Sequence, residues 1–328
     1  MEMRRFGPDQ ARDVEAALAI QNAAAAVDSP WDPPLLPQRF DALLRKGWDG
    51  EPPVAYLAVV DGRPVGTGMT FTSERDNTHL AWLRLTVHPE SRRRGYGSRM
   101  FECMVEEVRA AGRSSVGTDG WDTDRTRAFA KRFGLEVRSQ AIQRRQYLKQ
   151  TDLDGIRRLY DDAATLAAEY ELIRVAGRTP HALVDTVVEL LGAINDAPTD
   201  DLDIEDEVFS AERLAAYEEA SLARGDRDYR VIARHRETGQ GAGHTAVSVE
   251  SQRPTIAHQG DTAVVRAHRG HRLGLLLKAD MLLWLAEAEP QIEHLNTWNA
   301  ESNDHMISVN EALGYRVMGR ELQLQRSV

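Results

Sequence analysis

A strand–loop–helix segment occurs twice in this chain, about half its length apart, and it constrains the fold more than any other feature. The first copy covers residues 85–98 and the second covers residues 263–274. Each copy runs from β-branched residues through a basic, glycine-bearing loop into an apolar stretch with helical spacing. Such a loop aims several backbone N–H groups at one point, at the positive end of a helix. Both copies are therefore predicted to bind a pyrophosphate group.

A second pair of landmarks lies at nearly the same offset. The loop arginines are Arg92 and Arg269, and the glycines that end two short helical patterns are Gly134 and Gly314. The separation within each pair is almost the same and is slightly more than half the chain. Two landmarks at nearly one offset indicate a duplicated domain.

The length of the chain supports this reading. Its 328 residues exceed what one core usually organises. We therefore predict an α/β protein of two domains, residues 1–150 and residues 151–328, the second opening with a linker helix at 152–168.

Composition excludes several classes of function. The 41 basic and 51 acidic residues give a net charge of −10, which argues against nucleic-acid binding because that function needs a basic face. No run approaches the ~18 apolar residues of a membrane span, and no apolar segment behind the N-terminus resembles a signal peptide. The single Cys103 is interpreted as a core thiol. We expect a cytoplasmic monomer or homodimer with no metal site and no membrane partner.

The strand–Arg-x-x-Gly-x-Gly–helix order at Arg92, Gly95 and Gly97 resembles motif A of the GNAT (Gcn5-related) N-acetyltransferases. Both halves also share the family's order of strand, two helices, hairpin, strand, loop and helix, strand, helix and strand. The resemblance implies two domains, each a splayed mixed β-sheet flanked by helices. It also implies that acetyl-CoA is the co-substrate and that its acetyl group passes to a small primary amine in a ternary complex. The layout is similar to that of double acetyltransferases such as mycothiol synthase.

The resemblance assigns cofactor contacts to both copies of the segment. In the first copy they are Leu85, Val87, Arg92, Arg93, Arg94, Gly95, Tyr96, Gly97 and Ser98. In the second they are Val264, Val265, Arg269, Gly270, His271, Arg272 and Gly274, with Asn299 and Asn303 on the following strand and helix. The second copy departs from the pattern, because Arg272 stands where the first copy has Gly95. An arginine there can donate to phosphate, but we expect it to lose glycine's freedom for positive φ.

The two halves differ in their candidate catalytic groups. The tyrosine that the family often uses as an acid is replaced by Ala130 and Asn310. The family's common base position, eleven residues before the loop arginine, is Ala81 in the first half and His258 in the second. A histidine titrates near pH 6.5, so His258 is a candidate base, with a hydrogen-bonded structural histidine as the alternative. Asp261 is a second candidate. These residues favour the C-terminal half as the catalytic one and leave the reverse assignment open.

An acidic run at residues 200–207 has six carboxylates in eight positions. It falls between the first two expected helices of the second half, where the family grips its acceptor. The run either attracts a cationic amine or is a solvated loop. Two other functions stay open. The missing tyrosines allow a non-catalytic acyl-CoA-binding or sensor protein, and the layout allows a mycothiol-synthase-like acylation of a cysteinyl amino sugar.

Overall fold

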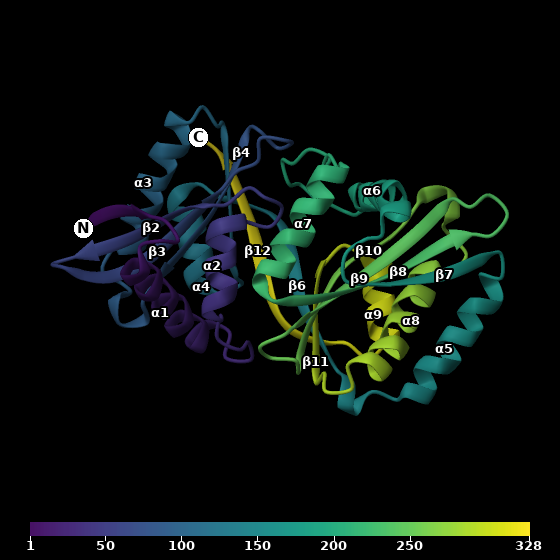
Figure 1. Cartoon of the computed structure of the whole chain (residues 1–328). Coiled ribbons are helices and arrows are strands. Elements are labelled where there is room, and N and C mark those ends of the chain that lie inside the picture. Colours follow the sequence, from purple (N-terminus) through teal and green to yellow (C-terminus); the bar gives the residue numbers. More distant parts are fainter. The chain divides into compact units, whose positions relative to one another are not determined.

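A computed structural model describes all 328 residues, which form two compact units. Unit 1 comprises Met1–Ala141, Thr199–Asp206 and Gly319–Val328, and unit 2 comprises Ile142–Pro198 and Glu207–Met318 (Figure 1). These bounds differ from the division expected at residue 150. The reason is that the last strand of each half runs from one unit into the other, so the chain's final strand helps to build the sheet of unit 1.

Unit 1 is a mixed sheet with helices on both faces. Its strands are β1 (Glu2–Phe6), β2 (Val54–Val60), β3 (Arg63–Phe71), β4 (Leu80–Val87), β5 (Ser115–Trp121), the start of β6 (Glu136–Tyr147) and most of β12 (Arg316–Ser327), and its helices are α1 (Ala11–Asp28), α2 (Pro37–Lys46), α3 (Tyr96–Ala110) and α4 (Asp124–Phe133). The sheet order is β1-β2-β3-β4-β5-β12. Helices α1 and α2 share a core with one face, and α3 and α4 share a core with the other.

The sheet of unit 1 splays in the middle. Strands β4 and β5 run parallel and pair only from Leu80↔Ser115 to Leu83↔Thr118. Beyond Leu83, β4 continues to Val87 with its other edge paired to β3, so the edge that faces β5 is left unpaired. Unpaired strand edges offer backbone N–H and C=O groups to a ligand. The splay predicted from the family resemblance is therefore present in this unit.

Unit 2 repeats this plan. Its strands are β7 (Tyr170–Ala176), β8 (Asp226–His235), β9 (Gly241–Glu250), β10 (Ile256–Val264), β11 (His294–Ala300) and the second half of β6, and its helices are α5 (Leu153–Leu166), α6 (Val184–Gly192), α7 (Ala211–Arg224), α8 (Leu273–Ala288) and α9 (Asp304–Ala312). The order is β6-β11-β10-β9-β8-β7. Helices α6 and α7 share a core with one face, and α5, α8 and α9 share a core with the other.

The sheet of unit 2 splays at the matching place. Strands β10 and β11 pair only over Ile256↔His294 to His258↔Asn296. The pairing of β10 with β9 is also irregular between Gln259 and Thr262, which marks a β-bulge. Bulges re-aim side chains and often lie beside active sites. Helix α5 was expected to be a linker, but it packs into the core of unit 2 through Ile156 and other buried residues.

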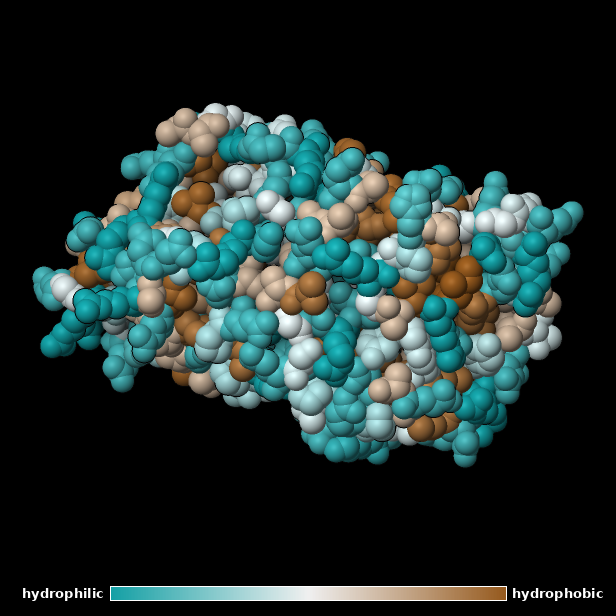
Figure 2. Space-filling view, viewed as in Figure 1, coloured by the Kyte–Doolittle hydropathy of each residue, from teal (hydrophilic) through white to brown (hydrophobic).

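The surface matches the composition. On the face drawn in Figure 2, hydrophilic residues predominate and hydrophobic ones lie among them in small groups. None of the helices combines the length and the apolar character that crossing a membrane requires.

Candidate functional site

The loop before α3 has the backbone shape of an anion cradle. A 3-10 turn at Pro89–Ser91 leads into two left-handed residues, Arg93 with φ 65° and Gly95 with φ 81°. Gly95 occupies the N-cap position of α3 and supplies no side-chain cap. The N–H groups of the first helical turn therefore lack an intrahelical partner and point into the loop. This arrangement suits a diphosphate.

The loop before α8 has the same backbone shape. Its 3-10 turn is Arg266–His268, and its left-handed residues are Gly270 with φ 90° and Arg272 with φ 55°. The expectation that Arg272 loses the positive φ is therefore wrong. The arginine adopts the left-handed conformation, at a cost of about 1–2 kcal/mol. It caps α8 without a side-chain hydrogen bond, as Gly95 does in α3.

The two loop arginines anchor their loops in the same way. Arg92 Nε donates to Val87 O at 3.1 Å, and Arg269 Nε donates to Val264 O at 3.1 Å. The outer guanidinium nitrogens of Arg92 bind both carboxylate oxygens of Asp28, at 3.0 and 2.6 Å. Arg269 reaches Asp196 at 2.7 Å. Arg92 thus ties its loop to the end of α1, and Arg269 ties its loop to the 3-10 turn Ala193–Asp196. With these guanidinium groups engaged, the main chain of each loop is what is left to bind an anion.

The charge state of Asp28 is consistent with this anchoring. Burial raises its pKa, but hydrogen bonds from Arg92 and Arg125 outweigh that effect and hold the pKa below its ordinary value. The carboxylate is therefore charged at neutral pH. It keeps the bidentate geometry that makes such pairs strong.

Several of the other expected cofactor residues have structural partners. Asn303 Oδ1 accepts from Met306 N at 3.1 Å and so caps α9, and Asn299 Oδ1 accepts from Asn310 Nδ2 at 2.7 Å. His271 packs its ring against Tyr170, with 5.5 Å between centroids. Leu85, Val87 and Val264 lie on the splayed parts of β4 and β10. The main chain of these strands, rather than a set of free side chains, is what the structure offers to a pantetheine arm.

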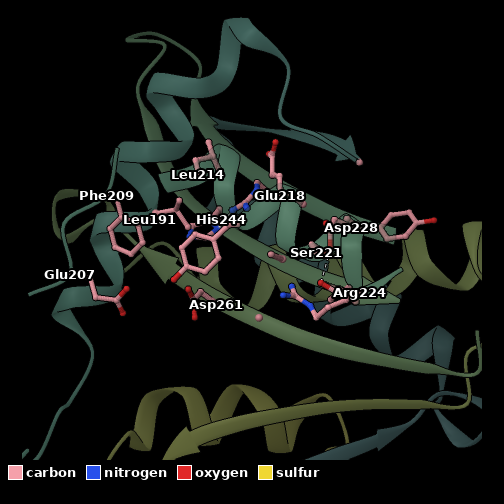
Figure 3. A pocket seen from close by; sticks show the side chains of 18 residues that line it. Leu191, Glu207, Phe209, Leu214, Glu218, Ser221, Arg224, Asp228, His244 and Asp261 are labelled. Atoms are coloured by element: carbon pink, nitrogen blue, oxygen red, sulfur yellow. Dashed lines mark hydrogen bonds between the residues drawn. The ribbon is translucent and has the colours of Figure 1, made fainter. Parts of the chain in front are cut away.

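A cavity of about 200 Å³ lies in unit 2 between α7 and the strands β8, β9 and β10 (Figure 3). One face of α7 lines it, from Leu214 to Arg224. Opposite lie polar side chains from alternate positions of the strands, among them His244 and Asp261. The lining carries four carboxylates and two arginines: Glu207, Glu218, Asp228, Asp261, Arg224 and Arg230. The cavity therefore has an excess of negative charge.

Asp261 stands at the β10 bulge, beyond the last pairing of β10 with β11. Its surroundings desolvate the carboxyl and raise its pKa above the ordinary value, and the charge of Arg230 opposes the rise. The side chain is exposed to the cavity, so water that enters moderates the shift. Asp261 is thus a carboxylate at the junction of the cavity and the free strand edge.

Arg230 is held beside it by a buried histidine. Its Nη1 donates to His244 Nδ1 at 2.9 Å, which makes His244 the neutral tautomer with its proton on Nε2. Burial, and then the charge of Arg230, lowers the pKa of His244 well below its ordinary value. His244 therefore stays neutral and positions a guanidinium that lines the cavity.

The other carboxylates have fixed partners. Asp228 accepts from Ser221 Oγ at 2.8 Å and from Ser248 Oγ at 2.7 Å (Figure 3). Glu218 accepts from the backbone N–H of Thr179 at 2.8 Å. Asp261 has no such partner, so it is the carboxylate best placed to exchange a proton with a bound molecule.

The two candidate bases, His258 and Asp261, have different surroundings. His258 Nε2 lies 2.8 Å from Glu250 Oε1, and Arg253 binds the same carboxylate. His258 is not among the residues that line the cavity. It occupies the last paired position of β10 before the splay, three residues from Asp261. The arrangement fits a structural ion pair better than a base aimed at an acceptor.

The acidic run lies elsewhere than expected. Residues 199–206 belong to unit 1, where Asp203 N donates to Gln325 Oε1, Glu205 accepts from Asn77 N and Asp200 accepts from Ser139 Oγ. These bonds hold the run against unit 1. Only Glu207, the last residue of the run, reaches the cavity. The other members of the run do not line this cavity.

Arg230 and His244 were not among the residues predicted from the sequence. Both lie inside strands, Arg230 on β8 and His244 on β9, at positions that line the cavity beside α7. His244 stands in a buried stretch of small and apolar residues, which is a usable signal because burial of a polar group without a partner is costly. Arg230 stands among other charged residues of β8 and has no such signal. The candidate bases were found by counting back from the loop arginine, and that count reaches only β10. It therefore could not identify residues on β8 and β9.

The geometry agrees with comparisons to known proteins. Residues 20–135 match the model of the acetyltransferase (GNAT) family. A tandem GNAT protein from the clavulanic acid biosynthesis pathway, solved without AcCoA, is 26% identical with a TM-score of 0.82, over 99% of this chain and 98% of that one. A GCN5-related N-acetyltransferase from Sphaerobacter thermophilus has a TM-score of 0.68 at 14% identity, over 99% and 95%. No curated protein matches the chain.

Proposed function

Because this chain is a tandem GNAT protein and thus an acyl-CoA-dependent acyltransferase, we propose that its unit 2 acetylates a small primary amine. The observation that carries this proposal is the position of Asp261. It lines the cavity and also belongs to the strand whose free edge follows the splay. Acyl donor and acceptor can therefore meet at one residue.

Acetyl-CoA supplies the activated acyl group. The N–H groups that follow Gly270 and Arg272 hold its diphosphate, and the unpaired edge of β10 holds the pantetheine arm. The residues present fit this ligand, since both left-handed positions and the uncapped helix start recur in the two loops. The second loop, which has Arg272 in place of a glycine, therefore keeps the backbone shape that binding a diphosphate requires.

Asp261 acts on the acceptor. An amine that enters as an ammonium ion loses one proton to the Asp261 carboxylate. The neutral nitrogen then attacks the thioester carbon, so that a C–N bond forms and the C–S bond breaks. The second nitrogen proton leaves with the thiolate as free thiol. Because the pKa of Asp261 is raised, it differs less from the pKa of the ammonium group that Asp261 must deprotonate.

The acetyl group passes directly between the two substrates. A covalent intermediate needs a nucleophile such as cysteine, and the one cysteine of the chain, Cys103, lies on α3 of unit 1. The cavity volume of about 200 Å³ is below the ~300–1,000 Å³ usual for drug-sized ligands. Its four carboxylates attract a cation. These features support a small ammonium acceptor.

Release of CoA thiol from acetyl-CoA tests the proposal with a panel of histamine, tyramine, putrescine and glucosamine. We expect Asp261→Asn to lower kcat for at least one amine by about 100-fold or more, with acetyl-CoA affinity unchanged by calorimetry. Asp162→Asn, an exposed change on α5, is the matched control. His258→Ala is expected to retain turnover.

Kinetic patterns test the direct transfer. Double-reciprocal plots at several amine concentrations should intersect, as a ternary complex requires, whereas parallel lines would indicate a covalent intermediate. Acetyl-CoA binding without turnover of any amine would instead support a non-catalytic sensor. Turnover that is lost in His258→Ala but kept in Asp261→Asn would overturn the assignment of the base.

A further inference from the structure

The last strand of the chain brings a carboxylate to the splay of unit 1. Strand β12 runs antiparallel to β5 from Glu321↔Trp121 to Ser327↔Ser115. Glu321 therefore lies opposite the end of β5, three residues beyond Thr118, where the pairing with β4 stops. Its neighbour Leu322 packs into the core with α3 and α4. Because side chains alternate along a strand, Glu321 faces the side that α1 and α2 cover.

Glu321 is the one carboxyl of its cluster without a partner. Asp119 accepts from Trp82 Nε1 at 3.0 Å and lies 3.6 Å from Arg84 Nε. Asp32, in the segment between α1 and α2, has partners of its own. No hydrogen bond or ion pair engages Glu321, although it is partly buried. A carboxyl withdrawn from water without a partner is costly to maintain, which points to a bound group that it serves.

Two tryptophans form a wall beside this carboxyl. The rings of Trp31 and Trp121 meet edge to face, with 5.3 Å between centroids at 77°. Both lie over Gly319, two residues before Glu321 on the same strand face. A Cβ atom there would come within 2.6 Å of Trp121 and 2.9 Å of Trp31. Aromatic faces attract cations, so the wall and the carboxyl together suit an ammonium group.

We propose that unit 1 holds a second acyl-transfer site, in which Glu321 of the chain's last strand takes the proton from the acceptor ammonium. The first loop and the free edge of β4 hold the acyl-CoA. The ammonium gives one proton to Glu321, its nitrogen attacks the thioester carbon, the C–N bond forms as the C–S bond breaks, and the second proton leaves with CoA as thiol. This site is separate from the cavity of unit 2.

The charges around Glu321 suit this role. Burial and the neighbouring Asp119 raise its pKa, Arg84 opposes the rise, Asp32 adds to it, and the pKa reaches about 8. These three groups come from β5, β4 and the α1–α2 segment. A base with a pKa closer to that of an amine takes its proton more readily than an ordinary carboxylate does.

Variants of each site separate the two activities. Asp261→Asn leaves unit 1 as the source of turnover, and the panel of histamine, tyramine, putrescine and glucosamine with acetyl-CoA is assayed in that background. We expect turnover of at least one amine, with kcat rising as the pH increases through about 8. Adding Glu321→Gln should lower that turnover by about 100-fold and remove the pH limb. Glu2→Gln, on the exposed edge strand β1, is the matched control.

A second readout needs no acyl donor. Without ligand, the melting temperature of Glu321→Gln relative to that of the wild type should rise between pH 5 and pH 9, because only the wild type loses the stability that a raised folded pKa gives. The proposal is overturned if Asp261→Asn retains no turnover, or if Glu321→Gln changes neither the residual turnover nor the pH dependence of melting. Full turnover in Asp261→Asn that depends on Glu321 would support unit 1 and contradict the site in unit 2.

Discussion

Replacing Lys278 with methionine should stabilise unit 2 at neutral pH. Lys278 lies on α8 with 2% of its surface exposed, inside the core that α8 forms with the sheet. Its ammonium donates to Gln259 Oε1 at 3.3 Å and lies 4.9 Å from the centre of the Tyr315 ring. No carboxylate pairs with it. Burial lowers its pKa from 10.5 to about 7, because the core disfavours the charged form.

The size of the effect follows from that difference. A fall from 10.5 to about 7 corresponds to about 4 kcal/mol of unfavourable free energy at pH 7, since each pKa unit is worth ~1.4 kcal/mol. Methionine has a similar unbranched shape but loses the hydrogen bond to Gln259, worth ~1 kcal/mol. The variant should therefore gain about 3 kcal/mol at pH 7.

The pH dependence has a definite sign. Between pH 7 and pH 10.5 the unfolded chain binds more protons at Lys278 than the folded chain, so the stability of the wild type rises with pH. At pH 9 the cost of burying Lys278 falls to about 2 kcal/mol. The advantage of Lys278→Met should then shrink to about 1 kcal/mol.

Hydrogen exchange of α8 peptides along a urea series measures the stability of unit 2 by itself. Lys131→Met, an exposed change on α4, should alter stability by no more than ~0.5 kcal/mol at either pH. A Lys278→Met protein that is less stable than the wild type at pH 7 would refute the reasoning. A gain that is equal at pH 7 and pH 9 would refute it as well, because the gain would not come from the charge.

Three further predictions concern unit 1 and the loops. Glu321→Gln should stabilise unit 1 by about 4–5 kcal/mol at pH 9 and little at pH 5, because a folded pKa raised from 4.5 to about 8 makes the stability of the wild type fall as the pH rises above ~4.5. Equal melting shifts at both pH values would contradict this. Arg272→Gly should relieve a positive φ of 55°, stabilise unit 2 by up to ~1 kcal/mol and leave acetyl-CoA affinity within a few-fold by calorimetry, whereas a tenfold loss would mean that the side chain binds phosphate. Arg92→Ala and Asp28→Ala should each destabilise unit 1, and a double-mutant cycle of urea unfolding should give a coupling of ~1–3 kcal/mol; simple additivity would show that the bidentate pair contributes nothing.

Local patterns in the sequence determined the duplicated plan. The β-branched run, basic loop and apolar helix predicted each strand–loop–helix segment, and the offset between the two loops recurs in their 3-10 turns and left-handed residues. These features depend on residues only a few positions apart, so they can be predicted from hydrophobic periodicity and from the residue types in turns. The resemblance of these segments to motif A of the GNAT family, rather than their spacing alone, implied the fold and the acyl-CoA co-substrate.

Tertiary structure decided which side chains form the sites. A regular strand would place His258 and Asp261, three residues apart, on opposite faces. The bulge between Gln259 and Thr262 shifts the alternation and aims Asp261 into the cavity, whereas His258 contacts Glu250 outside it. Glu321 lies more than half the chain away from Asp119 in sequence and joins it only because β12 pairs with β5. Strand pairing and bulges depend on contacts between distant segments, and a single sequence carries no local signal for them.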